Sequence, residues 1–175
     1  VRTNNGNPYG LEPEIAWNTG VSGAREFTLG LKEGTFKVDY FYTWFENQVI
    51  VNFDAGPRAV VIDNLDGRSF SHSLQAQLDY EIFTRYDIRL AYRFNDVRST
   101  INGELLPEAF TPKHRAFVNM AYETMDGWKF DMTVNWQGIK RIPGTASNPE
   151  EFQRDSYSPD FFLWHGQVTK GFGEI

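Results

Sequence analysis

Between residues 69 and 82, polar and apolar side chains alternate with a strict period of two. The apolar positions are even-numbered, with the single exception of His72, and the polar positions are odd-numbered. Successive side chains leave a β-strand on opposite faces, so this period indicates a strand with one apolar and one polar face. Strands of soluble proteins average about five or six residues, and a tilted strand crosses a bilayer in roughly nine to eleven. The length of this run therefore favours a membrane-spanning strand.

Six further segments alternate in a similar way. We expect seven long strands, at residues 17–31, 36–51, 69–82, 87–98, 114–123, 128–139 and 161–172. Glycines at positions 20, 23 and 30 weaken the first expected strand, and Phe41 and Phe45 break the alternation of the second.

The connections between these strands alternate in length. Residues 31–35, 83–86 and 124–127 make short turns, whereas residues 54–68, 99–113 and 140–160 make long loops. Up-and-down outer-membrane barrels have short turns on the periplasmic side and long loops on the extracellular side. A β-sandwich with Greek-key connections has no reason to alternate in this way.

Composition narrows the class of protein further. The mean hydropathy of −0.48 leaves no window apolar enough for a membrane helix, whereas a barrel hides its apolar half in alternation. The net charge of −6 argues against a nucleic-acid partner. Cysteine is absent, so no disulfide holds the fold.

Together these features predict an all-β chain that forms part of an antiparallel up-and-down transmembrane β-barrel. In hydrocarbon a sheet must close on itself to pair its backbone groups, and bacterial barrels have even strand numbers. Seven strands therefore predict a fragment of a larger barrel, with residues 1–175 as part of one barrel domain. We expect both ends of the chain to be cuts. Aromatic residues beside the short turns predict an interfacial girdle: Tyr80, Tyr86, Tyr122 and Trp128.

An ordered series of short motifs resembles the barrels of TonB-dependent outer-membrane receptors. Residues 11–20 resemble an LxPExxWNxG stretch, residues 39–49 a DYYxTxFxNQV strand, and residues 64–71 an NLDGxSxS turn. The series continues through residues 91–97, 112–117, 128–133 and 136–143. The resemblance is closest to the large Bacteroidetes-type receptors that carry a carboxypeptidase-regulatory-like domain at their N-terminus.

This resemblance implies a barrel of about 22 strands, of which the chain would hold the thirteenth to nineteenth. The plug domain and the final strands would lie outside it. The implied function is energy-coupled uptake of a scarce solute, such as a metal chelate, cobalamin or a glycan, in the outer membrane of a Gram-negative bacterium. The implied partners are outer-membrane lipid, the receptor's own plug domain, TonB with its inner-membrane energising complex, and a surface lipoprotein.

Charged side chains on the polar face of the strands are the first candidate site. The best candidates for contact with a plug or for lining the lumen are Arg93, Arg115 and Asp131. Opposite charges such as Asp79 and Arg89 are expected instead to pair across strands.

The second candidate site is the longest loop, residues 140–160. Loops of this length are usually functional or disordered. Within it we expect contact with solute or a partner at Asn148, Glu150 and Glu151.

No arrangement of nucleophile, base and orienting group predicts an enzyme, and no cofactor or metal is expected. Residues 63–67 lack the spacing of a calcium loop and predict a tight turn. None of His72, His114 and His165 pairs with a second ligand at metal spacing, and each is expected to form ordinary hydrogen bonds.

Two alternatives remain open at this stage. One is a soluble, secreted β-sandwich that binds carbohydrate through Trp44, Trp136 and Trp164. The other is a segment of a passive porin, which shares the strand pattern but has no plug.

Overall fold

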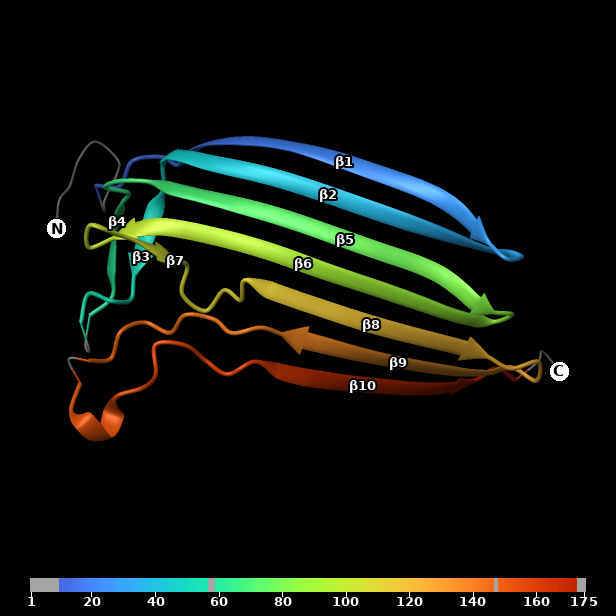
Figure 1. Cartoon of the computed structure of the whole chain (residues 1–175). Coiled ribbons are helices and arrows are strands. Elements are labelled where there is room, and N and C mark those ends of the chain that lie inside the picture. Colours follow the sequence, from blue (N-terminus) through green and yellow to red (C-terminus); the bar gives the residue numbers. More distant parts are fainter. Residues whose placement is uncertain (1–9, 57–58, 147, 173–175) are drawn as a thin grey trace.

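The structure, a computed structural model, describes residues 10–56, 59–146 and 148–172. Its main element is one antiparallel sheet in which the long strands lie side by side in chain order (Figure 1). These strands are β1 (Ile15–Leu29), β2 (Lys32–Asn47), β5 (Ser69–Phe83), β6 (Tyr86–Ile101), β8 (His114–Glu123), β9 (Trp128–Gln137) and β10 (Phe161–Lys170). All seven expected strands are confirmed, and their ends differ from the expected ones by at most four residues.

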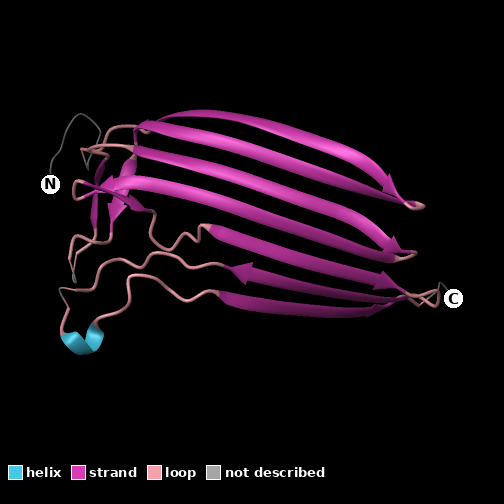
Figure 2. Ribbon diagram, in the orientation of Figure 1, coloured by secondary structure: helices cyan, strands magenta, loops and turns pink. Residues whose placement is uncertain are grey.

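Short turns and long loops occupy opposite ends of the sheet, as predicted (Figure 2). The loop end also holds three short strands and one helical turn that the sequence did not predict as separate elements. These are β3 (Val49–Asn52), β4 (Val61–Asn64), β7 (Glu104–Pro107) and the 3₁₀ helix η1 (Glu150–Phe152). β3 pairs with β4, and β7 pairs with β6. No helix in the described part of the chain is long and apolar enough to cross a membrane.

The register aligns apolar side chains into continuous rows across the sheet. One such row runs through Phe36, Leu78, Leu90, Val118, Val134 and Trp164. The neighbouring row on the same face runs through Val38, Ala76, Tyr92, Ala116, Trp136 and Phe162. Because the strands are in register over most of their length, the alternation within each strand becomes one apolar face of the whole sheet.

The opposite face carries polar and charged rows. One row runs through Asp39, Gln75, Arg93, Arg115 and Gln137. Another runs through Thr35, Asp79, Arg89, Asn119, Thr133 and His165. Three hollows along the strands are lined mainly by residues of this polar face, and the one next to the short turns of β1–β2 and β5–β6 has a volume of about 650 Å³.

The sheet is a single layer and has no soluble-type core. Apart from glycine and proline, only Ile101 and Ala109 are buried apolar residues among the described residues, whereas Trp164 and Val168 are more than half exposed. A sandwich needs two sheets packed face to face. The alternative of a carbohydrate-binding sandwich is therefore wrong, and Trp136 and Trp164 lie within the apolar face of one sheet.

Glycines in the sheet make room for aromatic rings rather than interrupting it. The ring of Phe41 covers Gly20, where an added Cβ would lie 2.3 Å from the ring carbon Cδ1. Phe27 covers Gly34 in the same way. Both Gly20 and Gly23 lie within the continuous strand β1. The space over Gly20 accommodates the ring of Phe41 on the polar face, which explains why an aromatic residue breaks the alternation there.

Candidate functional site

Some charged side chains of the polar face form ion pairs, whereas others, such as Lys37 and Asp39, form none within the described part of the chain. Lys32 Nζ lies 2.8 Å from Glu81 Oε1, and Arg89 donates a hydrogen bond through Nε to Asp79. The expected pairing of Asp79 with Arg89 across β5 and β6 is thus confirmed. These pairs solvate the polar face and stabilise the pairing of neighbouring strands.

An acidic hollow lies on the polar face next to the short turns. Its carboxylates come from two hairpins, β1–β2 and β5–β6, and Arg89 is the basic residue in its lining. The acidic members are Glu26, Glu33, Asp79, Glu81 and Asp87. The sequence did not reveal this cluster, because only the register brings residues from β1, β2, β5 and β6 to one place.

Arg93 and Arg115 lie directly opposite each other on β6 and β8. Both are exposed on the polar face, and uncharged amides flank them in the same row, Gln75 on β5 and Gln137 on β9. Arg93 Nη2 donates a long hydrogen bond of 3.5 Å to Ser73 Oγ. Among the described residues, no carboxylate lies within ion-pair distance of either guanidinium.

Asp131, the third predicted lumen residue, is not part of this arrangement. It lies on β9 opposite Ala121, nearer to the short turns. Asn119 Nδ2 donates to both of its carboxylate oxygens at 3.1 Å. The structure thus brings Arg93 and Arg115 together and leaves Asp131 in a separate hydrogen-bonded pair.

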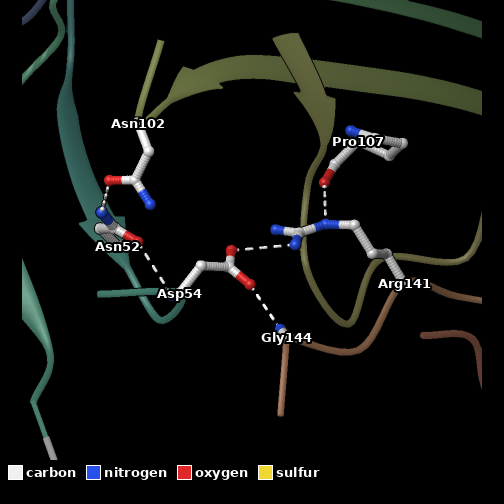
Figure 3. A network of polar contacts seen from close by, with 6 residues as sticks. All are labelled: Asn52, Asp54, Asn102, Pro107, Arg141 and Gly144. Carbon is white, nitrogen blue, oxygen red and sulfur yellow. Dashed lines mark hydrogen bonds and ion pairs between the residues drawn. The ribbon is translucent and has the colours of Figure 1, made fainter. Parts of the chain in front are cut away.

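Arg141 joins three long loops at the other end of the sheet (Figure 3). Its Nε donates to the carbonyl of Pro107 at 2.7 Å, and its Nη1 lies 2.9 Å from Asp54 Oδ2. The second carboxylate oxygen of Asp54 accepts from the backbone N–H of Gly144 at 2.6 Å. The side chains of Arg141 and Asp54 are 9% and 14% exposed, so the ion pair is largely removed from water. We call this set of contacts the loop staple.

Further contacts surround the loop staple. The backbone N–H of Phe110 donates to the carbonyl of Arg141 at 2.9 Å, and the rings of Phe110 and Phe53 meet edge to face at 5.8 Å. Glu108 lies in the same layer, where burial raises the pKa of its carboxyl above the ordinary value although the charge of Arg141 acts in the opposite direction. The three loops therefore form one connected layer.

Residues of three sequence motifs meet where β1 begins and β2 ends, at the long-loop end of the sheet. Asn64 exchanges two hydrogen bonds with the backbone of Glu12, at 2.7 and 3.0 Å. The carboxylate of Glu14 accepts from the N–H of Val49 at 3.0 Å, and Asn47 Nδ2 donates to the carbonyl of Pro13 at 2.8 Å. The first, second and third motifs thus hold one another at this end of the sheet.

The predicted solute-contact residues lie around η1, at the tip of the longest loop. Glu150 and Glu151 are exposed and line a shallow hollow together with Pro149. The side-chain amide of Asn148 donates to the carbonyl of Phe152 at 3.5 Å, which places it within the fold of its own loop. Contact of these residues with a solute stays a prediction.

Two histidines bond to tyrosines on neighbouring strands. Nδ1 of His72 lies 2.8 Å from the hydroxyl of Tyr40, and Nδ1 of His114 lies 2.7 Å from that of Tyr92. The expectation of ordinary hydrogen bonds is confirmed for these two. Within the described ranges, no group of three or more His, Cys, Asp or Glu side chains is placed to hold a metal ion.

The family model described as TonB dependent receptor-like, beta-barrel, matches residues 1–172. The chain belongs to this family of TonB-dependent receptor barrels. No curated protein sequence matches it. Among solved structures it is similar to a chain in the structure of the FpvAI–pyocin S2 complex, with a TM-score of 0.61 and 14% identity. That match covers 90% of this chain and 22% of the other, so the chain spans about a fifth of its structural relative and shares its fold.

Proposed function

We propose that the chain is a wall segment, with three extracellular loops, of an outer-membrane receptor that imports a scarce solute with energy supplied through TonB. The two-faced sheet is the observation that carries this proposal. Its apolar face suits contact with lipid, and its polar, hollowed face suits a water-filled or plugged lumen. In this proposal residues 1–175 form part of one barrel domain of about 22 strands, and the plug and final strands come from the rest of the protein.

The proposed orientation follows from the two ends of the sheet. The long loops with the loop staple would face the exterior, and the short turns would face the periplasm. Aromatic residues of the apolar face lie next to the short turns, where an interfacial girdle is expected. Tyr86 and Tyr122 face each other across β6 and β8, and Lys170 lies 5.1 Å from the ring centre of Trp128.

The proposed partners are those of an energised receptor. They are lipid of the Gram-negative outer membrane, the receptor's own plug, TonB with its inner-membrane complex, and a surface lipoprotein. The solute class, a metal chelate, cobalamin or a glycan, and the Bacteroidetes type rest on the resemblance of the motif series at residues 11–20, 39–49 and 64–71.

Uptake by cells that express the complete protein tests the proposal. Cells would be offered a ferric chelate, cobalamin and an oligosaccharide, with and without TonB. We expect uptake of one class, and loss of this uptake when TonB is removed. Uptake that persists without TonB would instead support a passive porin.

The assignment of the two faces has its own test. Spin labels placed along β5 of the complete protein in lipid report accessibility to oxygen and to a water-soluble nickel chelate. Labels at Ala76 and Leu78 should favour oxygen, and labels at Gln75 and Gln77 should favour the chelate. Equal accessibility at both parities would contradict the barrel-wall assignment.

A further inference from the structure

We propose that Arg93 and Arg115 form a carboxylate-binding site on the wall of the barrel lumen. This inference rests on the proposed function, because it places the polar face inside the barrel. It adds a ligand chemistry and two binding residues to that function.

The first argument is the like charge of the pair. Directly opposite residues on antiparallel strands have Cβ atoms about 4.5–5.5 Å apart, and like charges in such positions destabilise the sheet. Arg93 and Arg115 are directly opposite, and their row neighbours Gln75 and Gln137 carry no charge. An anion bound between the two guanidinium groups would remove this repulsion.

The second argument is the lack of a partner within the described part of the chain. Asp39 is the carboxylate of the same row, but β5 lies between it and Arg93, a separation of roughly 10 Å. Asp96, which is close in sequence, lies on the other face, where it pairs with Arg98 at 3.2 Å and Lys113 at 3.3 Å. By contrast, Arg89 on the same face of β6 has its own carboxylate partner.

The third argument is the shape and chemistry of the surroundings. A hollow of about 260 Å³ opens over the pair, and its lining includes the amides of Gln75, Asn135 and Gln137. Pockets for whole drug-sized ligands measure roughly 300–1,000 Å³, so this hollow suits a single small group. Guanidinium groups bind a carboxylate through two parallel hydrogen bonds, and the amides add further donors.

The carboxylate has two sources in a receptor of this kind. One is an Asp or Glu side chain of the plug, and the other is an anionic group of the solute. Both present the same chemistry to the arginines, so the experiment has one arm for each source.

The first arm measures hydrogen exchange of the plug in the complete receptor, in lipid nanodiscs and without solute. The variant Arg93→Gln/Arg115→Gln is compared with Arg89→Gln, a matched change on the same face that removes a paired arginine. If the plug supplies the carboxylate, plug amides exchange about tenfold faster in the double variant, which loses charged hydrogen bonds, and not in Arg89→Gln.

The second arm uses the unaltered receptor and so needs no variant to fold. Phenylglyoxal modifies accessible arginines, and mass spectrometry reads Arg93, Arg115 and Arg89 separately. If a solute anion occupies the site, citrate as a probe carboxylate slows modification of Arg93 and Arg115 about tenfold and leaves Arg89 unchanged.

The proposal is overturned if plug exchange is unchanged in the double variant and citrate protects neither Arg93 nor Arg115. This failure is distinct from failure of the proposed function. Uptake that does not depend on TonB would remove the receptor assignment, whereas the citrate arm would still report whether the pair binds a carboxylate.

Discussion

Arg141 and Asp54 form an ion pair across 87 residues of sequence, and both side chains are largely buried between loops. Removing one partner of a buried pair leaves the other charge uncompensated, at a cost of about 3–5 kcal/mol. We expect Arg141→Met to speed hydrogen exchange in residues 48–56, 102–113 and 138–146 together. Arg154→Met, in an exposed part of the same loop, serves as the control. Faster exchange confined to 138–146 would show that the loop staple does not connect the three loops.

Glu108 should make the loop layer sensitive to pH. Burial raises the pKa of its carboxyl, so the folded layer holds this proton more tightly than the unfolded chain does. Its contribution is fully present below the ordinary Glu pKa of about 4.3 and is lost as pH rises through the folded value. Glu108→Gln should remove this part of the pH dependence of loop exchange. Identical pH profiles for the variant and the parent would contradict the assignment.

Ala76 and Gln77 are neighbours on β5 that face opposite sides of the sheet. Arginine on the lipid face near the bilayer midplane costs about 2–4 kcal/mol. Ala76→Arg should therefore lower the free energy of unfolding of the complete barrel in lipid by this amount, whereas Gln77→Arg should change it little. Urea unfolding followed by tryptophan fluorescence gives the comparison, and equal losses for both variants would argue against a lipid-facing Ala76.

Gly20 and Gly23 provide a matched pair on β1. A methyl group on Gly20 would collide with the ring of Phe41 and the carbonyl of Tyr40, whereas a Cβ on Gly23 meets nothing within 4 Å. Overpacking of this kind costs about 1–3 kcal/mol. Gly20→Ala should destabilise the barrel in the same unfolding assay, and Gly23→Ala should be neutral. The prediction fails if the two variants have the same stability.

The long strands could be predicted because their alternation is local and repeated. The period of two in residues 69–82 needs no knowledge of the partner strand, and the ends of β8 were predicted without error. β4 and β7 escaped prediction because four residues are too few to show a period, whereas most of β3 was included in the expected strand 36–51. Gln48, between Asn47 and Val49, separates two strands that the pattern merged into one.

The candidate sites could be predicted only in part. The parity of Arg93 and Arg115 placed both on the polar face, but their direct opposition depends on the register of β6 and β8. The loop staple could not be predicted, because nothing near Asp54 in the sequence indicates Arg141 as its partner. The alternation correctly placed Asp131 on the same face as the arginines, but it could not show that Asp131 lies in a different row of the sheet.

The loop staple also restricts how such a barrel can evolve. An up-and-down barrel can gain or lose one hairpin at a time. Each such change alters its circumference by two strand spacings, or roughly 10 Å. A hairpin inserted between β5 and β9 would carry Asp54 and Arg141 apart by that distance, beyond the reach of their side chains. Related barrels of different diameter should therefore gain or lose hairpins outside the segment from β5 to β9.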